Sequence, residues 1–188
     1  MNRKVFAWLG IVTLFGFSAL GIWLVEAFQE VPFRVVFFNG WPWWQQLGVG
    51  LVYGLASGMA AWWLLQRKWM REMTVVYAGL FSSLELSMQD ILFISLAAGV
   101  GEEILFRAGV QPFLGIWGTS ILFVAIHGYL DPRKWRVMVY GTAMTLIIAG
   151  IGWMFEHVGL VSCMVAHFTI DVYLLVMGER YPMLPSEN

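Results

Sequence analysis

Long apolar stretches are the feature of this sequence that most restricts its fold. Of the 188 residues, 60% are hydrophobic and only 12% are charged, whereas a soluble domain has about 25% charged residues. Six stretches come near the roughly 20 residues that a helix needs to cross a bilayer, although the third and fourth are short. They are Val5–Phe28, Leu47–Leu65, Ile91–Phe106, Phe113–Gly128, Val137–Phe155 and Leu160–Met177. The sequence therefore predicts an all-α, polytopic transmembrane helical bundle of about six spans.

The organisation along the chain is simple. No repeat and no soluble segment is visible, so residues 1–188 are expected to form a single integral membrane domain, with a motif-bearing core at 90–178. The first apolar run is longer than the hydrophobic region of a signal peptide, about 7 to 15 residues, and we interpret it as a transmembrane helix. The amphipathic stretch Met73–Met88 is expected to lie at the interface or to lengthen the third span.

Basic residues indicate how the bundle is oriented. They precede the first span, follow the second, precede the fifth and follow the sixth. If both termini are cytoplasmic, these clusters all lie inside and only Arg34 lies in an outer loop, as the positive-inside rule requires. The clusters are Arg3 and Lys4; Arg67, Lys68 and Arg71; Arg133, Lys134 and Arg136; and Arg180. We expect an integral protein of the lipid bilayer, located in the bacterial inner (plasma) membrane. Its net charge of −1 gives no indication of nucleic-acid binding.

Ionisable residues inside the predicted spans need an explanation. Insertion of one charged group into hydrocarbon costs roughly 2.5 to 3.5 kcal/mol, and such residues mark functional sites. Three groups of them occur on three different spans. They are Glu102, Glu103 and Arg107 in the third span, His127 in the fourth, and His167 with Asp171 in the sixth. Carboxylates and imidazoles are the side chains that activate water.

The acidic group divides by helical geometry. Glu103 and Arg107 are four residues apart, so they share a helix face and can form an ion pair. Glu102 is rotated by about 100° from its neighbour and points elsewhere. We therefore assign a supporting role to Glu103 and Arg107, and leave Glu102 as the free carboxylate that can act as a general base. An ion network that only packs helices is the alternative for this group taken alone.

The position of His127 depends on a break in its helix. The histidine reaches the depth of the acidic group only if Gln111–Trp117 forms a short turn or helix at the outer surface and the helix proper starts near Gly118. Pro112, Gly115 and Gly118 permit that break. Phe123 is four residues before His127, so its ring is expected to cover one side of the imidazole. The alternative for His127, taken alone, is a core histidine whose hydrogen bonds are satisfied and which has no catalytic role.

His167 and Asp171 repeat the spacing of four residues on the last span. The aspartate can then orient the imidazole, or both side chains can face one cavity. A buried hydrogen-bonded pair without function remains the alternative. Outside the three groups, Cys163 is expected to be a small buried side chain and His157 an exposed residue near a loop.

Taken together, the three groups form an ordered set of motifs. The chain reads EEILFR at 102–107, FVAIH at 123–127 and HFTID at 167–171. This order resembles the EExxxR, FxxxH and HxxxN/D signature of the CPBP family, the CAAX protease and bacteriocin-processing type of intramembrane protease. The resemblance implies a helical membrane endopeptidase of the glutamic type.

The same resemblance implies roles for the residues. Glu102 and His127 match the positions that activate the attacking water, and His167 and Asp171 match those that stabilise the oxyanion. Glu103 and Arg107 match the supporting pair. No cofactor is favoured.

Asp171 is where the prenyl-protein endopeptidases have asparagine. An ionised aspartate cannot donate to an oxyanion. It is therefore either protonated or supports a cationic His167 that donates in its place. A third possibility is that His127, His167 and Asp171 form a zinc site, since two histidines and one carboxylate are an ordinary metal set.

The sequence therefore predicts a protease whose partner is a hydrophobic or membrane-anchored peptide; its oligomeric state stays open. A non-catalytic immunity or assembly protein with the same scaffold is the alternative. A proton or ion transporter is less favoured, although intramembrane carboxylates and histidines also serve proton relays.

Overall fold

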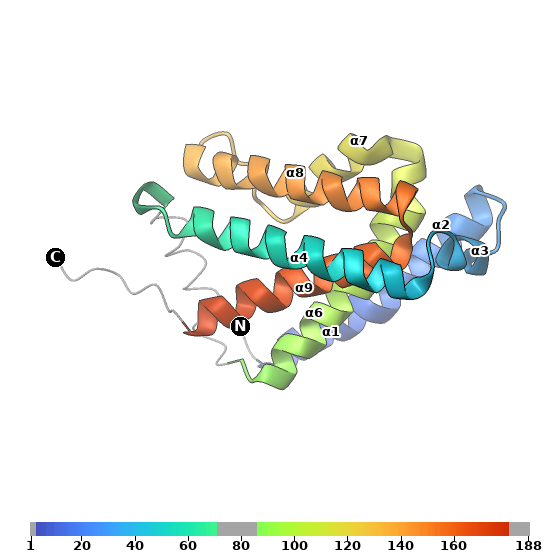
Figure 1. Cartoon of the computed structure of the whole chain (residues 1–188), viewed down its shortest axis with the longest axis horizontal. Helices are drawn as coiled ribbons and strands as arrows, with labels where there is room; N and C mark the ends of the chain where they lie inside the picture. The colour runs from blue at the N-terminus through green and yellow to red at the C-terminus, as the bar shows by residue number, and fades with distance from the viewer. Residues whose placement is uncertain (1–2, 71–85, 181–188) are drawn as a thin grey trace.

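The computed structural model describes residues 3–70 and 86–180, and within them the secondary structure is entirely helical (Figure 1). The first half contains α1 (Arg3–Ile11), η1 (Val12–Phe17), α2 (Ser18–Phe28), α3 (Phe33–Phe38), α4 (Trp43–Leu65) and η2 (Lys68–Met70). The second half contains α6 (Met88–Glu103), η3 (Ile104–Val110), α7 (Gln111–Ile126), α8 (Trp135–His157) and α9 (Leu160–Arg180). The segments η1 and η3 are π-helical and η2 is a 3₁₀ turn.

Five helices among the described residues are long and apolar enough to cross a membrane. The predicted all-α polytopic bundle is therefore confirmed, and the chain is an integral membrane protein. The third of these helices, Met88–Ile126, contains the third predicted span and all but the last two residues of the fourth. Most of the predicted amphipathic stretch Met73–Met88 lies outside the described residues; its last residue, Met88, opens α6. The short helix α3 was not predicted.

A glycine reverses the direction of the long third helix. Gly115 has φ 65° and ψ 175° inside α7, a conformation that is essentially restricted to glycine. The chain crosses the bundle through α6, η3 and the first residues of α7, and then turns back at Gly115. The helical segment that follows Gly115 has about 11 residues and is roughly 17 Å long. It is therefore too short to cross the bilayer, and it ends within it. The predicted break is thus present, three residues before the expected Gly118.

Glycines bring α4 and α9 into close contact. Gly50, Gly54 and Gly58 are spaced four residues apart on the face of α4 that meets α9. A Cβ on Gly54 would lie 2.7 Å from the carbonyl oxygen of Ala166. Small residues at such a spacing let two membrane helices approach until their backbones touch. This contact fixes α9, which carries His167, against the rest of the bundle.

The first long helix packs against the helix that carries the acidic motif. Gly21 of α2 faces the backbone of Ile104 in η3, and Gly101 of α6 faces the backbone of Thr13 in η1. Both π-helical segments therefore lie at the crossing of these two helices. Gln29 extends the contact, because its amide nitrogen donates to the Ala108 carbonyl at 2.8 Å.

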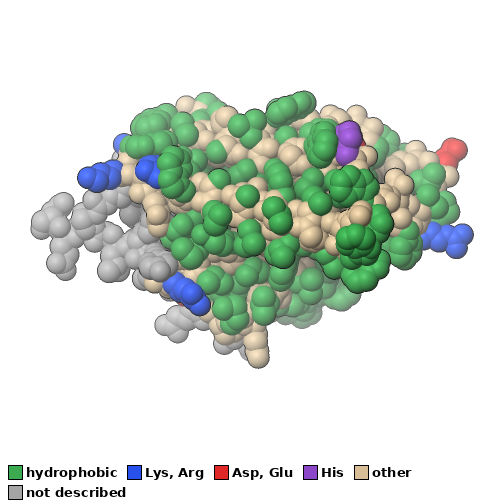
Figure 2. Space-filling view, in the orientation of Figure 1, with side chains coloured by type: hydrophobic (Ala, Val, Ile, Leu, Met, Phe, Trp, Pro, Cys, Tyr) green, Lys and Arg blue, Asp and Glu red, His purple; other side chains and the backbone are tan. Residues whose placement is uncertain are grey.

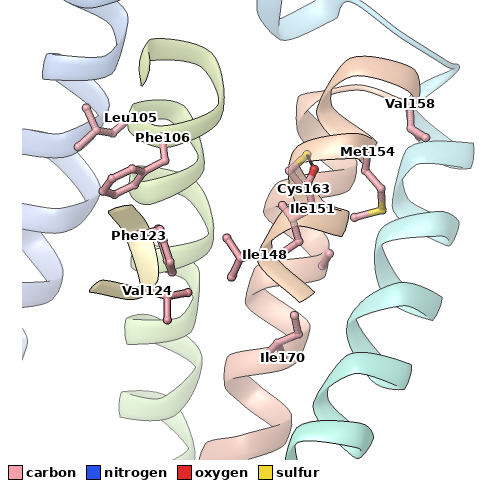
Figure 3. Close-up of a cluster of buried hydrophobic side chains, with 11 residues drawn as sticks. Leu105, Phe106, Phe123, Val124, Ile148, Ile151, Met154, Val158, Cys163 and Ile170 are labelled. Carbon is pink, nitrogen blue, oxygen red and sulfur yellow. Dashed lines mark hydrogen bonds between the residues drawn. The ribbon is translucent and has the colours of Figure 1, made fainter. Parts of the chain in front are cut away.

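The largest apolar cluster joins η3, α7, α8 and α9 (Figure 3). The ring of Phe106 meets that of Phe123 edge to face, with centroids 5.0 Å apart. The cluster also joins Ile151 of α8 to Cys163 of α9, because the Cys163 thiol donates a hydrogen bond to the Ile151 carbonyl at 3.3 Å. Cys163 is fully buried, as predicted. The cluster lies directly beside the motif residues and holds their helices together.

The surface shows the pattern expected of a membrane protein (Figure 2). Hydrophobic side chains cover its visible face, and Lys and Arg side chains gather mainly at the end where α4 ends and α8 begins. The opposite end carries α3 and the exposed tryptophans Trp41, Trp43 and Trp44. Tryptophan is typical of membrane interfaces.

Replacement of Gly115 by alanine should destabilise the reversal. No other atom lies within 4 Å of the Cβ position there, so the effect comes from backbone strain alone, about 1 to 3 kcal/mol. The midpoint of thermal unfolding in detergent should fall. Gly48→Ala is the matched control, because Gly48 is helical and its Cβ position is also open. Equal unfolding midpoints for the two variants would contradict the importance of this turn.

Candidate active site

The three motif groups, far apart in the sequence, meet in one place. Glu102 and Glu103 lie at the end of α6, His127 directly follows α7, and His167 lies two turns into α9. The reversal at Gly115 brings His127 back along the bundle to the level of the acidic pair. The two glutamates face different partners, as the helical rotation between them predicted.

Glu102 faces His127. Its Oε2 lies 3.8 Å from Nε2 of the imidazole, which is too far for a direct hydrogen bond. This oxygen is buried and has no hydrogen-bond partner within the described part of the chain. The side chain of His127 is 36% exposed and that of Glu102 is 13% exposed. The two groups therefore form an open pair: they face each other without a direct hydrogen bond, and a polar atom that bridges both must lie to one side of the line that joins them.

The imidazole of His127 is held in one tautomer. Its Nδ1 lies 2.7 Å from the carbonyl oxygen of Phe123. A carbonyl only accepts, so Nδ1 carries the hydrogen and Nε2 of the neutral ring is an acceptor. The ring of Phe123 stacks on the imidazole with centroids 4.5 Å apart, as predicted, and Tyr129 lies parallel at 6.3 Å. Nε2 is thereby fixed in its direction toward Glu102.

Glu103 binds the side chains of Arg107 and His167 at once. Its Oε2 accepts from Nε of Arg107 at 3.1 Å, and its Oε1 accepts from Nδ1 of His167 at 2.7 Å. Glu103 and Arg107 are fully buried. Charge-assisted hydrogen bonds of this kind offset much of the penalty for burying an ion. The predicted pair of Glu103 and Arg107 is present, and it extends to a second helix through His167.

Asp171 lies on the other side of the His167 ring. Its Oδ2 is 3.6 Å from Nε2, beyond hydrogen-bond distance. Glu103, and not Asp171, therefore fixes the orientation of this imidazole. Both His167 Nε2 and the 30% exposed side chain of Asp171 remain available to another group.

Gln111 belongs to the same network and was missed in the sequence. It is buried, and its Oε1 accepts from Nη1 of Arg107 at 3.1 Å. Its Nε2 donates to the Gly152 carbonyl at 2.9 Å and to Glu156 at 3.0 Å. A signal was present in the sequence, because Gln111 continues the spacing of four from Glu103 and Arg107.

The potential metal ligands among the described residues are not grouped as they are in a metal site. No group of three or more His, Cys, Asp or Glu side chains that could hold a metal ion occurs in the ranges 3–70 and 86–180. The alternative set of His127, His167 and Asp171 is therefore not assembled as a ligand cluster.

His157 lies apart from the site, as an exposed side chain whose ring stacks on that of Trp153 with centroids 4.3 Å apart.

Comparison with known proteins agrees with this arrangement. Residues 84–173 match the Rce1-like family, described as type II CAAX prenyl endopeptidase Rce1-like. An uncharacterized protein of Bacillus subtilis (strain 168), YpbD, is 38% identical over 87 residues, which are 45% of this chain and 43% of that protein. The chain thus aligns with less than half of the relative's length. No solved structure matches the chain.

The matched segment contains all three motifs and every residue of the network around Glu103. It begins just before α6 and ends within α9, so it includes the helices that bring the acidic and histidine side chains together. The resemblance to the CPBP proteases is therefore confirmed, because residues 84–173 match the Rce1-like family.

Proposed function

We propose that this chain is an intramembrane endopeptidase in which Glu102 and His127 activate a water molecule. The observation that carries the proposal is the open pair itself. Two groups able to accept a proton, from separate helices, face each other at 3.8 Å. Their neighbours Glu103 and Arg107 are engaged with each other. The match to a family of endopeptidases supports the same reaction.

The reaction begins with a water held between Glu102 Oε2 and His127 Nε2. Glu102 takes one proton as the water oxygen attacks the scissile carbonyl, while His127 accepts the second hydrogen bond and orients the water. The C–N bond then breaks and Glu102 returns the proton to the leaving amine. Glutamate is therefore first the general base and then the general acid.

His167 stabilises the oxyanion in this proposal. Its Nδ1–H is committed to Glu103, so a second hydrogen on Nε2 makes the ring cationic and able to donate to developing negative charge. Asp171, 3.6 Å from Nε2, balances that cation. Of the roles left open for Asp171, the geometry favours support of a cationic His167.

The substrate is a hydrophobic or membrane-tethered peptide segment. His127 and Asp171 keep part of their surface exposed in a bundle whose other surfaces are largely apolar. A peptide can therefore approach them from the lipid side. The distribution of basic residues supports a site in the outer half of the membrane. That position suits an exported peptide or a membrane sorting segment rather than a prenylated cytoplasmic one.

Loss of either member of the pair should abolish cleavage. Glu102→Gln and His127→Ala should each lower kcat/KM by roughly 10²- to 10⁴-fold, the usual contribution of acid–base catalysis. The measurement is cleavage of hydrophobic transmembrane peptides by purified protein in liposomes, read by mass spectrometry. His157→Ala is the control, because this exposed histidine is outside the site. Full activity of Glu102→Gln would exclude the mechanism and favour a non-catalytic role.

Chelators should leave the activity unchanged. The proposed mechanism uses side chains and water alone, so EDTA should alter the cleavage rate less than about twofold, whereas loss of a catalytic zinc would remove most of the activity. Inhibition by EDTA that added zinc reverses would contradict the metal-free mechanism.

Both termini should be cytoplasmic. The basic clusters at one end of the bundle predict this orientation, and a reporter fused to the C-terminus tests it. Alkaline phosphatase should be inactive and a fluorescent protein that folds only in the cytoplasm should be bright. The opposite result would place the site in the inner half of the membrane.

A further inference from the structure

We propose that Gln111 is a positioning residue of the active site. It acts through Arg107 and Glu103 to hold His167 in the orientation that oxyanion stabilisation requires. The inference rests on the function proposed above, and it assigns a role to a residue outside the three motifs. Gln111 touches neither Glu102 nor His127.

The amide of Gln111 can have only one orientation. Its three partners are a guanidinium, a backbone carbonyl and a carboxylate. The guanidinium only donates and the two oxygens only accept, so the amide oxygen must face Arg107 and the amide nitrogen must face α8. A buried amide with both ends satisfied is a rigid link between η3 and α8.

Arg107 depends on that link. Its guanidinium is fully buried. Nε binds Glu103, Nη1 binds Gln111, and Nη2 has no partner among the residues that the structure describes. If the Gln111 oxygen is removed, two of the three guanidinium nitrogens lack an acceptor, which is strongly unfavourable in a buried site. The guanidinium must then turn toward another acceptor.

Movement of Arg107 is transmitted to His167. The Glu103 carboxylate is fixed on one oxygen by Arg107 and presents the other to Nδ1 of His167 at 2.7 Å. When the guanidinium turns, the carboxylate is free to rotate and the histidine loses its fixed partner. The chain of contacts from Gln111 to His167 is continuous, and each step in it is a hydrogen bond of 3.1 Å or less.

The pair of Gln111 and Arg107 can also be disturbed from α8. A Cβ on Gly152 would lie 2.8 Å from Oε1 of Gln111 and 3.3 Å from Nη1 of Arg107. Gly152→Ala therefore presses on the same contact without changing either residue. Gln111→Met removes the hydrogen bonds and keeps the length of the side chain.

The test compares these variants of the full chain in lipid nanodiscs by two readouts. The first is the ¹⁵N resonance of His167 Nδ1, assigned by replacing each of the three histidines in turn. The second is kcat and KM for a transmembrane peptide that the wild type cleaves. Gln111→Met and Gly152→Ala should both shift the His167 resonance. They should lower kcat roughly 10- to 100-fold, with KM changed less than about twofold.

Glu156→Gln is the matched control, because it keeps an oxygen acceptor for Gln111 and leaves Gly152 untouched. It should change neither readout. An unshifted His167 resonance in both variants would overturn the proposal, as would a shifted resonance with unchanged kcat. If the wild type cleaves no peptide, the proposed function fails, and the resonance alone still decides whether Gln111 positions His167.

Discussion

The carboxylate of Glu103 is the interaction on which the rest of the site depends. It is fully buried and binds Arg107 on its own helix and His167 on α9. A lone buried carboxylate in a bilayer would be strongly unfavourable, so its two partners must stay in place. The two bonds of Glu103 therefore hold α9 against the end of α6 at one fixed position along the helix axis. The neighbouring residue, Glu102, is thereby fixed opposite His127.

Two adjacent glutamates thus have different surroundings because a helix points them in different directions. Both carboxylate oxygens of Glu103 accept hydrogen bonds, whereas Glu102 keeps an oxygen with no partner in the described chain. The packing around them is close enough to preserve this difference. Gly101 and Gly21 bring the first long helix against the motif helix, and Gly54 brings α4 against α9. Rigid surroundings are what a site needs if one water is to be held in a single position.

Much of this arrangement could be predicted from the sequence, because membrane insertion limits the possible folds. The apolar stretches predicted the spans, and the charged residues inside them are the ones that the fold brings together. A break before His127 was also predicted, with Pro112, Gly115 and Gly118 as the candidate positions. The bond between Glu103 and His167 could not be predicted, since helical spacing shows neighbours within one helix and says nothing of contacts between helices. Gln111 was missed because an amide carries no charge, so the spacing of four residues from Arg107 was the signal that pointed to it.

The most direct test of this account compares the stability of two neighbouring variants. Glu103→Gln removes a charge from a buried network and should reduce the free energy of unfolding by about 3 to 5 kcal/mol. Glu102→Gln removes a charge with no hydrogen-bond partner and should leave stability unchanged or slightly higher. Thermal unfolding of both variants in the same detergent measures the difference. A large loss for Glu103→Gln alone is the predicted result, whereas equal losses, or a greater loss for Glu102→Gln, would contradict the assignment of one glutamate to the scaffold and the other to the chemistry.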